Sequence, residues 1–341
     1  MIQEQQPARN LPLYRRIAEN LQRDILEGVY PPDKALPSLR AMAIKTGYSR
    51  ETLVAAYRYL CRKGVLSSIP GKGYFVRAGF LSGKQSVLVL LDKFSPHQQS
   101  VMDALTDTLG DQADVTVLMH YQDLDRLSAQ LDTHLERYDW YIVFPHFPLE
   151  EAARQRAATL LRRIPAHKLI AVDRKAGFLP PECGVSYQSI EEDIPAAMKE
   201  TVPEILSFGR MRYSSLSVSL YGNLVGRTIQ SFCESNHIPF DTFKDMPDTI
   251  EKGDIFFVSG SRLDRKLLEL IQAIQARSLT IGKDVGLICY NDFPLNKLIL
   301  GGLTTLSTDF SFMGRAVAEM ILSRQLSSVH CPCRLIRRNT F

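Results

Sequence analysis

The chain has 341 residues, which is more than one small hydrophobic core can organise and predicts two or three folding units. Hydrophobic residues make up 45% of it, as in ordinary globular proteins. No apolar run has the roughly eighteen residues that a membrane span needs. The N-terminus lacks the apolar stretch of a secretory signal, so we expect a cytoplasmic protein without a membrane partner.

Positive charge is concentrated near the N-terminus. Residues 9–77 hold thirteen Lys and Arg against five Asp and Glu, a net charge of +8, whereas the whole chain carries +4. A basic module on a mildly acidic body predicts a polyanion partner for the module alone. Taken by itself, the charge would favour a merely solvated basic face.

Three short helices are predicted in this basic module. Apolar residues at helical spacing predict a helix over 13–26, which Gly28 ends. A second helix is predicted over 38–46, and Ser49 is expected to cap a third helix just after it.

A β-hairpin is predicted to follow the third helix. The strand patterns VLSSI and YFVR flank the turn Pro70-Gly71-Lys72-Gly73. Three helices and a hairpin form a winged helix-turn-helix. The forked guanidinium of Arg50, at the start of the third helix, can donate two hydrogen bonds to a guanine. Lys72 at the hairpin tip can reach a phosphate or the minor groove. The alternative is that Ser49 only caps its helix and that Arg40 and Arg50 are surface residues.

The module resembles the GntR family of bacterial regulators. The resemblance is carried, in order and spacing, by Leu36–Arg40 (LPSLR), Gly47–Thr52 (GYSRET), Lys63–Leu66 (KGVL) and Gly71–Val76 (GKGYFV). The sequence departs from the family at Leu39, usually Glu, and at Val54, where several members have a phosphate-binding Arg. The residues predicted to contact DNA are Ser38, Arg40, Ser49, Arg50, Glu51, Thr52, Gly71 and Lys72.

The rest of the chain predicts an α/β fold. Residues 78–86 are expected to be a linker, and 87–341 alternate apolar strand patterns with amphipathic helices. That alternation is typical of doubly wound parallel sheets. Two successive blocks of about 100–120 residues predict two lobes with a cleft between them.

Polar residues follow four of the predicted strands, and ligands bind at such carboxyl ends. These strand exits are 91–97, Asp173-Arg174, 259–262 and Tyr290-Asn291-Asp292. An Asp–Arg pair can clamp hydroxyls or a carboxylate, because it offers both acceptors and a forked donor. A solvated loop salt bridge is the alternative at each exit.

This second part resembles the periplasmic-binding-protein-like effector domain of LacI-type regulators. Asp173-Arg174 is similar to the Asp-Arg sugar-contact pair of that family. Tyr290–Leu295 with Leu303–Leu306 is similar to its Phe-Asp-Asp-x-Pro-Leu…Leu-Thr-Thr segment. Asn223 stands where many sugar-binding members have a clamping Arg. The resemblance implies a sugar or sugar derivative as effector. The predicted effector-binding residues are Ser95, His97, Asp173, Arg174, Asn223, Ser261, Tyr290 and Asn291.

The six cysteines are scattered, which favours free thiols in a reducing compartment. Cys331 and Cys333 form a C-x-C pair, but no second Cys or His pair follows at zinc-site spacing. We therefore expect a strand end there, and neither a metal nor a cofactor.

The combination of a GntR-type head with this body resembles the arabinose-repressor type of regulator. It implies a homodimer that presents two winged helices to operator DNA and represses until a small molecule binds between the lobes. One alternative is a pyridoxal-phosphate enzyme-like regulator. A body of about 260 residues is short for that class, and this sequence contains no P-loop or G-x-S-x-G motif. The other is a DNA-binding protein without an effector.

Overall fold

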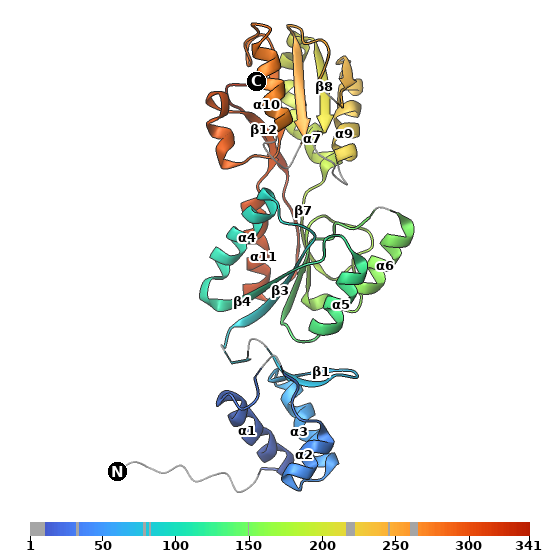
Figure 1. The fold of residues 1–341 in the computed structure, drawn as a ribbon, viewed down its shortest axis with the longest axis vertical. Coiled ribbons are helices and arrows are strands. Elements are labelled where there is room, and N and C mark those ends of the chain that lie inside the picture. The colour runs from blue at the N-terminus through green and yellow to red at the C-terminus, as the bar shows by residue number, and fades with distance from the viewer. Residues whose placement is uncertain are drawn as a thin grey trace, which may run out of the picture.

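The structure is a computed structural model that describes residues 11–31, 34–77, 80–81, 83–148, 150–215, 222–244, 246–259 and 265–341. They form three bodies stacked along one axis (Figure 1). We call them the head, lobe 1 and lobe 2, in order from the lower end of the figure. The predicted α/β fold with an N-terminal winged helix-turn-helix is confirmed.

The head is built from three helices and one hairpin. Its elements are α1 (Leu13–Leu26), α2 (Leu39–Thr46), α3 (Arg50–Arg62), β1 (Leu66–Ile69) and β2 (Gly73–Val76). The two predicted helix starts are capped: Ser38 accepts from the Ala41 N–H at 3.1 Å and Ser49 from the Thr52 N–H at 3.3 Å. The apolar faces of the helices and the hairpin share one buried core around Leu53.

Lobe 1 is a parallel six-stranded sheet in the order β13-β7-β6-β5-β3-β4. Its strands are β3 (Gln85–Leu91), β4 (Ala113–Met119), β5 (Trp140–Val143), β6 (Leu169–Asp173), β7 (Gly184–Tyr187) and β13 (Ser328–His330). Helices α4 (Pro96–Leu109) and α11 (Phe310–Ser323) cover one face, and α5 (Leu124–His134) and α6 (Glu151–Leu161) the other (Figure 1). Alternate residues of β3 therefore enter two different cores, as a strand buried on both faces requires.

Lobe 2 is a second six-stranded sheet in the order β14-β12-β11-β10-β8-β9, in which only β14 is antiparallel to its neighbour. Its strands are β8 (Arg210–Ser215), β9 (Phe240–Thr242), β10 (Asp254–Ser259), β11 (Gly286–Tyr290), β12 (Thr304–Thr308) and β14 (Cys333–Ile336). Its helices are α7 (Ile190–Met198), α8 (Val202–Phe208), α9 (Gly222–Ser235) and α10 (Arg265–Gln275). Helices α7 and α9 cover one face of the sheet and α10 covers the other.

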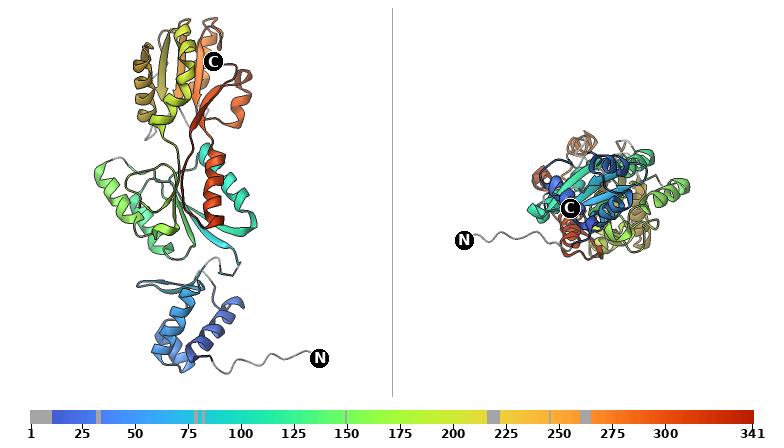
Figure 2. Two further views of the ribbon diagram at one scale, coloured as in Figure 1. Left: turned by 180° about the vertical axis from the view of Figure 1, so that it is seen from behind. Right: turned by 90° about the horizontal axis from the view of Figure 1, so that it is seen from below.

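The chain crosses between the lobes three times, from β7 to α7, from β12 to α11 and from β13 to β14. The prediction of two successive blocks is therefore wrong in detail, because α11 lies in lobe 1 beside α4 (Figures 1 and 2). The reason is local packing. A Cβ on Gly314 of α11 would lie 2.2 Å from the Val101 carbonyl oxygen of α4, so the missing side chain lets the two helices touch.

The sequence pattern over 214–220, SSLSVSL, also favours a strand, and its first two residues lie in β8. The observed β8 begins four residues earlier, and 216–221 lie outside the described residues. Two arginines interrupt the apolar pattern by which β8 could be predicted from the sequence. Arg210 and Arg212 form ion pairs with Asp254 at 2.5 and 3.3 Å, so charged side chains occupy a strand at low cost.

Candidate nucleic-acid interface and effector site

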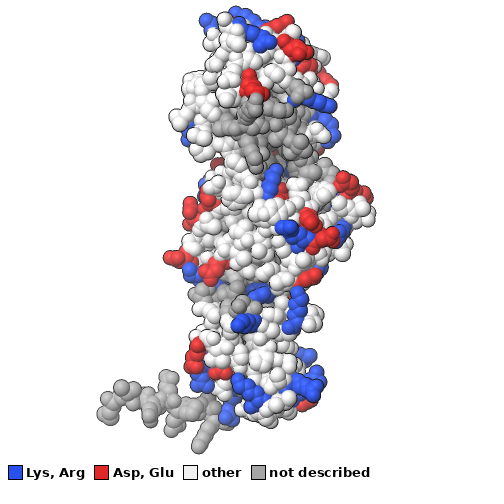
Figure 3. All heavy atoms as spheres, viewed as in Figure 1, with Lys and Arg blue, Asp and Glu red and all other residues white. Residues whose placement is uncertain are grey.

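The predicted DNA-contact residues lie at the far end of the head. Arg40, Arg50 and Glu51 are exposed, whereas Thr52 is half-buried and its hydroxyl lies 2.9 Å from that of Ser49. Ser49 therefore caps α3, which is the structural role that the sequence analysis gave as an alternative to DNA contact. Arg50 is exposed in the first turn of this helix. Lys and Arg side chains gather on the head at the lower end of the molecule (Figure 3).

The hairpin tip is placed against lobe 1. Its turn uses Gly71 and Gly73, whose φ angles of +74° and +108° suit glycine. Lys72 Nζ donates to the backbone oxygen of Asp132 at 2.8 Å, near the C-terminal end of α5. Arg137 lies over the ring of Phe75 at 5.2 Å. In this conformation Lys72 contacts the body.

The carboxyl ends of the parallel strands of lobe 1 lie at the edge of its sheet that is nearer lobe 2 (Figure 1). A polar or titratable residue follows or ends five of these strands, namely Asp92 after β3, His120 after β4, His146 after β5, Asp173 in β6 and Gln188 after β7. Asp92, His120, His146 and Asp173 are buried. Buried polar groups need partners, so their contacts define the site.

His146 lies between two carboxylates. Its Nδ1 is 3.2 Å from Asp92 Oδ1 and its Nε2 is 2.7 Å from Asp173 Oδ2. Burial opposes the charge on His146, but the contacts with Asp173 and Asp92 outweigh it and raise its pKa to about 9. Burial alone would also raise the pKa of Asp173, yet His146 holds it well below its usual range. At neutral pH the cluster therefore contains two carboxylates and one imidazolium.

Ser95, His97 and Gln98 surround the Asp92 side of this cluster. Ser95 Oγ donates to Gln98 Oε1 at 2.8 Å and lies 3.2 Å from His97 Nδ1, and Gln98 donates to Asp92. Burial lowers the pKa of His97 to about 4, so this imidazole is neutral at pH 7. The predicted residues Ser95 and His97 are thus part of one hydrogen-bonded set with the carboxylates.

Gln188 joins the cluster to lobe 2. Its Nε2 donates to Asp173 Oδ1 at 2.5 Å, while its Oε1 accepts from Thr308 Oγ1 at 2.8 Å and from Tyr290 OH at 3.4 Å. The predicted residues Asp173 and Tyr290, which are 117 positions apart in the sequence, therefore meet through this amide.

The equivalent strand exits of the two lobes share an unusual backbone. Asp173 has φ +77° and Asn291 has φ +72°, both in the left-handed region. Such conformations cost free energy in non-glycine residues and are often found at binding sites. The Oδ1 atom of Asn291 is buried without a hydrogen-bond partner among the described residues, so it offers an acceptor to a ligand.

The remaining predicted effector residues differ in their burial. Arg174 is half-buried beside Asp173, and Asn223 is exposed near the start of α9. Ser261 lies outside the described residues. Asp292, at the same exit as Tyr290, is held by Arg338, whose two terminal nitrogens each lie 2.7 Å from a carboxylate oxygen.

Sequence reasoning missed His146 and Gln188. His146 follows the apolar run WYIVF over 140–144, which favours a strand, so the strand-exit rule could have found it. Gln188 follows β7, a four-residue strand, Gly-Val-Ser-Tyr, that no apolar run indicated. Its role depends on contacts with two other strands, for which the sequence carries no signal.

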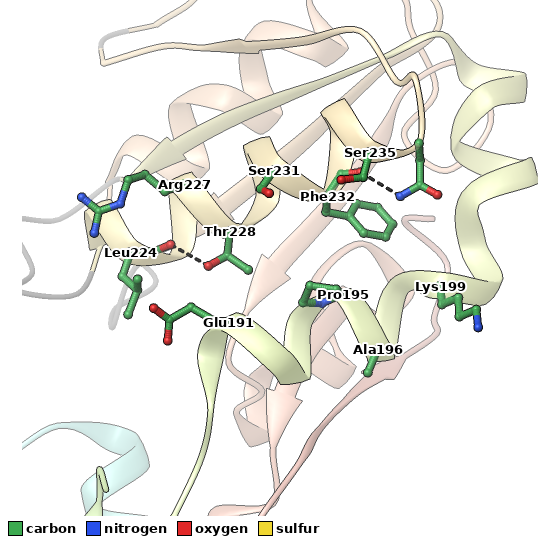
Figure 4. Close-up of a pocket in the computed structure, with 11 residues that line it drawn as sticks. Glu191, Pro195, Ala196, Lys199, Leu224, Arg227, Thr228, Ser231, Phe232 and Ser235 are labelled. Atoms are coloured by element: carbon green, nitrogen blue, oxygen red, sulfur yellow. Dashed lines mark hydrogen bonds between the residues drawn. The ribbon is translucent and has the colours of Figure 1, made fainter. Parts of the chain in front are cut away.

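A separate groove of about 550 Å³ lies between α7 and α9 of lobe 2 (Figure 4). It is lined by Glu191, Pro195, Ala196, Lys199, Leu224, Arg227, Thr228, Ser231, Phe232, Ser235 and Asn236. None of the predicted effector-binding residues lines it. It is therefore distinct from the strand-exit cluster.

Within the described ranges, no three His, Cys, Asp or Glu side chains are grouped in a way that could hold a metal ion. No helix in those ranges is both long enough and apolar enough to cross a membrane. The six cysteines are free, and Cys331 and Cys333 flank the crossing from β13 to β14.

Two segments of the chain match models of known protein families. Residues 13–76 match the family model of bacterial regulatory proteins, gntR family, and 235–341 match the periplasmic binding protein-like domain. The mannosyl-D-glycerate transport/metabolism system repressor MngR of Escherichia coli (strain K12) is 39% identical over 66 residues, which are 19% of this chain and 28% of that protein. The HTH-type transcriptional repressor NagR of Bacillus subtilis (strain 168) is 39% identical over 66 residues, 19% of this chain and 27% of that protein. The chain thus matches little more than a quarter of either relative.

Solved structures match the body. The trehalose repressor from Escherichia coli superimposes with a TM-score of 0.58 at 12% identity, covering 74% of this chain and 100% of that one. A LacI family transcriptional regulator from Lactobacillus casei with bound glucose gives 0.57 at 16% identity, covering 75% and 99%. At these identities the likeness concerns the fold.

Proposed function

We propose that this chain, which has a GntR-type helix-turn-helix head on a LacI-like, periplasmic-binding-protein-like body, is a transcription regulator whose DNA binding is controlled by a small molecule. The observation that carries the proposal is the match of residues 13–76 to the gntR family, together with the buried polar cluster at the strand exits of the body. We propose domain boundaries of 9–77 for the head, 78–86 for the linker and 87–341 for the body.

The head would bind duplex DNA through the first turn of α3. Arg50 is exposed there and can form two hydrogen bonds with a guanine in the major groove. Arg40 on α2 is also exposed and would contact the phosphate backbone of the DNA. Lys72 can reach DNA once its Nζ leaves the backbone oxygen of Asp132, to which it donates in this structure.

The effector would bind at the strand exits between the lobes. Asp173, His97, Ser95 and Tyr290 offer hydroxyl, imidazole and carboxylate groups that suit a polyol. A relative named for mannosyl-D-glycerate, a structural neighbour named for trehalose and another with bound glucose support a sugar or sugar derivative. Binding would stabilise one angle between the lobes and change DNA affinity by a coupling free energy of about 1–3 kcal/mol. We propose repression relieved by the effector, without enzymatic activity, in the cytoplasm where the chromosome lies.

We propose a homodimer formed through one side of the body. Val117 on the edge strand β4 is 44% exposed, and Leu295 and Leu298 in the turn after β11 are 59% and 76% exposed. Strand β4 and this turn lie on the same side of the molecule in both opposite views (Figures 1 and 2). A second copy on this side would cover these apolar side chains and place two heads on one duplex.

Two substitutions test whether the head binds DNA and the body binds the effector. Arg50→Ala should reduce affinity for a duplex selected with the full-length protein at least about fivefold, because it removes a base contact worth roughly 1–3 kcal/mol. The exposed Arg154→Ala on α6 is the matched control. Asp173→Ala should abolish the response of DNA affinity to sugars. Normal DNA binding by Arg50→Ala would refute the assignment of the head.

A further inference from the structure

A continuous line of polar contacts runs from lobe 1 into lobe 2. We call it the interlobe relay, and its members are Asp92, His146, Asp173, Gln188 and Thr308. Successive members are 3.2, 2.7, 2.5 and 2.8 Å apart between the bonded atoms. Each member follows or ends a different strand, so the relay links four strands of lobe 1 with β12 of lobe 2.

The chemistry of the relay fixes the orientation of Gln188. The ionised Asp173 can only accept hydrogen bonds, so the amide nitrogen of Gln188 must face it. The amide oxygen then accepts from the hydroxyl groups of Thr308 and Tyr290, both on lobe 2. The two oxygens of Asp173 are thus held from opposite sides, one by His146 and one by Gln188.

Two relay members also lie on the connections between the lobes. Gln188 stands between β7 and α7, on the first crossing of the chain, and Thr308 ends β12, immediately before the second crossing to α11. The Gln188–Thr308 hydrogen bond therefore fastens two of the three interlobe connections together. A rotation of one lobe against the other changes the backbone at these positions.

We propose that Gln188 is a positioning residue that couples the orientation of the Asp173 carboxylate to the interlobe connections, with His146 as the fixed support on the other side. The proposal rests on the proposed function, because it makes Asp173 the point where an effector is sensed. A ligand hydroxyl that bonds to Asp173 competes with Gln188 for the same oxygen. The displaced amide then releases Thr308, and the angle between the lobes changes.

A reversal of hydrogen-bond polarity tests the coupling. Gln188→Glu places a second carboxylate against Asp173 and should accelerate amide hydrogen exchange about tenfold at 186–190 and 304–308 of the full chain. Adding Asp173→Asn restores a donor between the two positions, since the Asn amide can donate to the carboxylate introduced at position 188 and its oxygen can accept from His146. The double variant should return to within about twofold of the wild-type rate. Gln275→Glu, exposed on α10, is the control.

A substitution in lobe 2 tests whether the effect crosses between the lobes. Thr308→Val removes the hydroxyl that holds Gln188 and should accelerate exchange at 171–175, in lobe 1, several-fold. A merely local structural role would confine the change to β12 and its neighbours. If Gln188→Glu does not fold, Gln188→Ala removes the same bonds without adding a charge and should raise exchange at both connections.

Two outcomes would overturn the proposal. One is a double variant that exchanges as fast as Gln188→Glu, and the other is a Thr308→Val effect restricted to lobe 2. None of these measurements uses DNA or an effector. A chain that fails to bind DNA but shows the rescue would therefore refute the proposed function and retain the relay.

Discussion

At the scale of single residues, the most consequential group is the His146 imidazole. It contacts Asp92 and Asp173, and it interacts electrostatically with His97. The carboxylates dominate, because His97 is neutral above about pH 4. A buried cation that neutralises two buried anions makes removal of either partner expensive. This explains how two carboxylates remain ionised at the strand exits, ready to accept hydrogen bonds.

Because of His146, the free energy of unfolding of the body should fall as the pH becomes alkaline. The folded pKa of His146, about 9, lies above the usual 6.5, so its contribution is complete below about pH 6.5 and is lost as pH rises through 9. Thermal unfolding between pH 6 and pH 10 should show this loss, and NMR of the labelled imidazole should show the titration. His146→Gln should flatten that part of the profile. An imidazole that titrates near pH 6.5 in the folded chain would contradict the assignment.

At the scale of elements, packing of α4 on α11 shapes lobe 1. The two helices come from opposite ends of the body, and Gly314 permits their contact. The sequence predicts both helices from their apolar periodicity, but the periodicity does not say which helices meet. A helix at the end of the chain would, by sequence order alone, be assigned to lobe 2.

Gly314→Ala should destabilise lobe 1. Its Cβ would lie 2.2 Å from a backbone oxygen of α4, which cannot move away as a side chain can. We expect a loss of about 1–3 kcal/mol in the free energy of unfolding, measured in urea. Gly177→Ala, where nothing lies within 4 Å of the added Cβ, should change it little. Equal stability of the two variants would show that α4 and α11 are not in close contact.

At the scale of the whole molecule, the head is joined to the body by more than its linker. Lys72 and Arg137 bring the hairpin and α5 together. The proposed dimer would add a second constraint, because the body would set the distance between two heads. Both arrangements make DNA binding sensitive to changes in the body.

Disruption of the proposed dimer side should yield monomers. Leu298→Glu places a charge where an apolar side chain is 76% exposed, and it should shift the sedimenting mass toward the 38.5 kDa of one chain. Leu268→Glu on α10, where Leu268 is 54% exposed, is the matched control and should leave the mass unchanged. A dimer that persists in Leu298→Glu would exclude this side as the interface.

The sequence by itself determined the head and the α/β character of the body, because both depend on short-range signals. Ser38 and Ser49 cap helices, Gly71 and Gly73 form a turn, and apolar runs such as β3 are buried wherever they pack. The same signals selected Asp173 and Tyr290 as candidates but left open whether they meet.

Only the tertiary structure decided which candidates form one site. Asp92, His146 and Asp173 are neighbours because strand order places β3, β5 and β6 side by side. Strand order and the three crossings arise from contacts between residues far apart in the chain, such as those of α11 with α4. Local propensity contains no information about such contacts, so Gln188 and its link to Thr308 could be found only in the folded molecule.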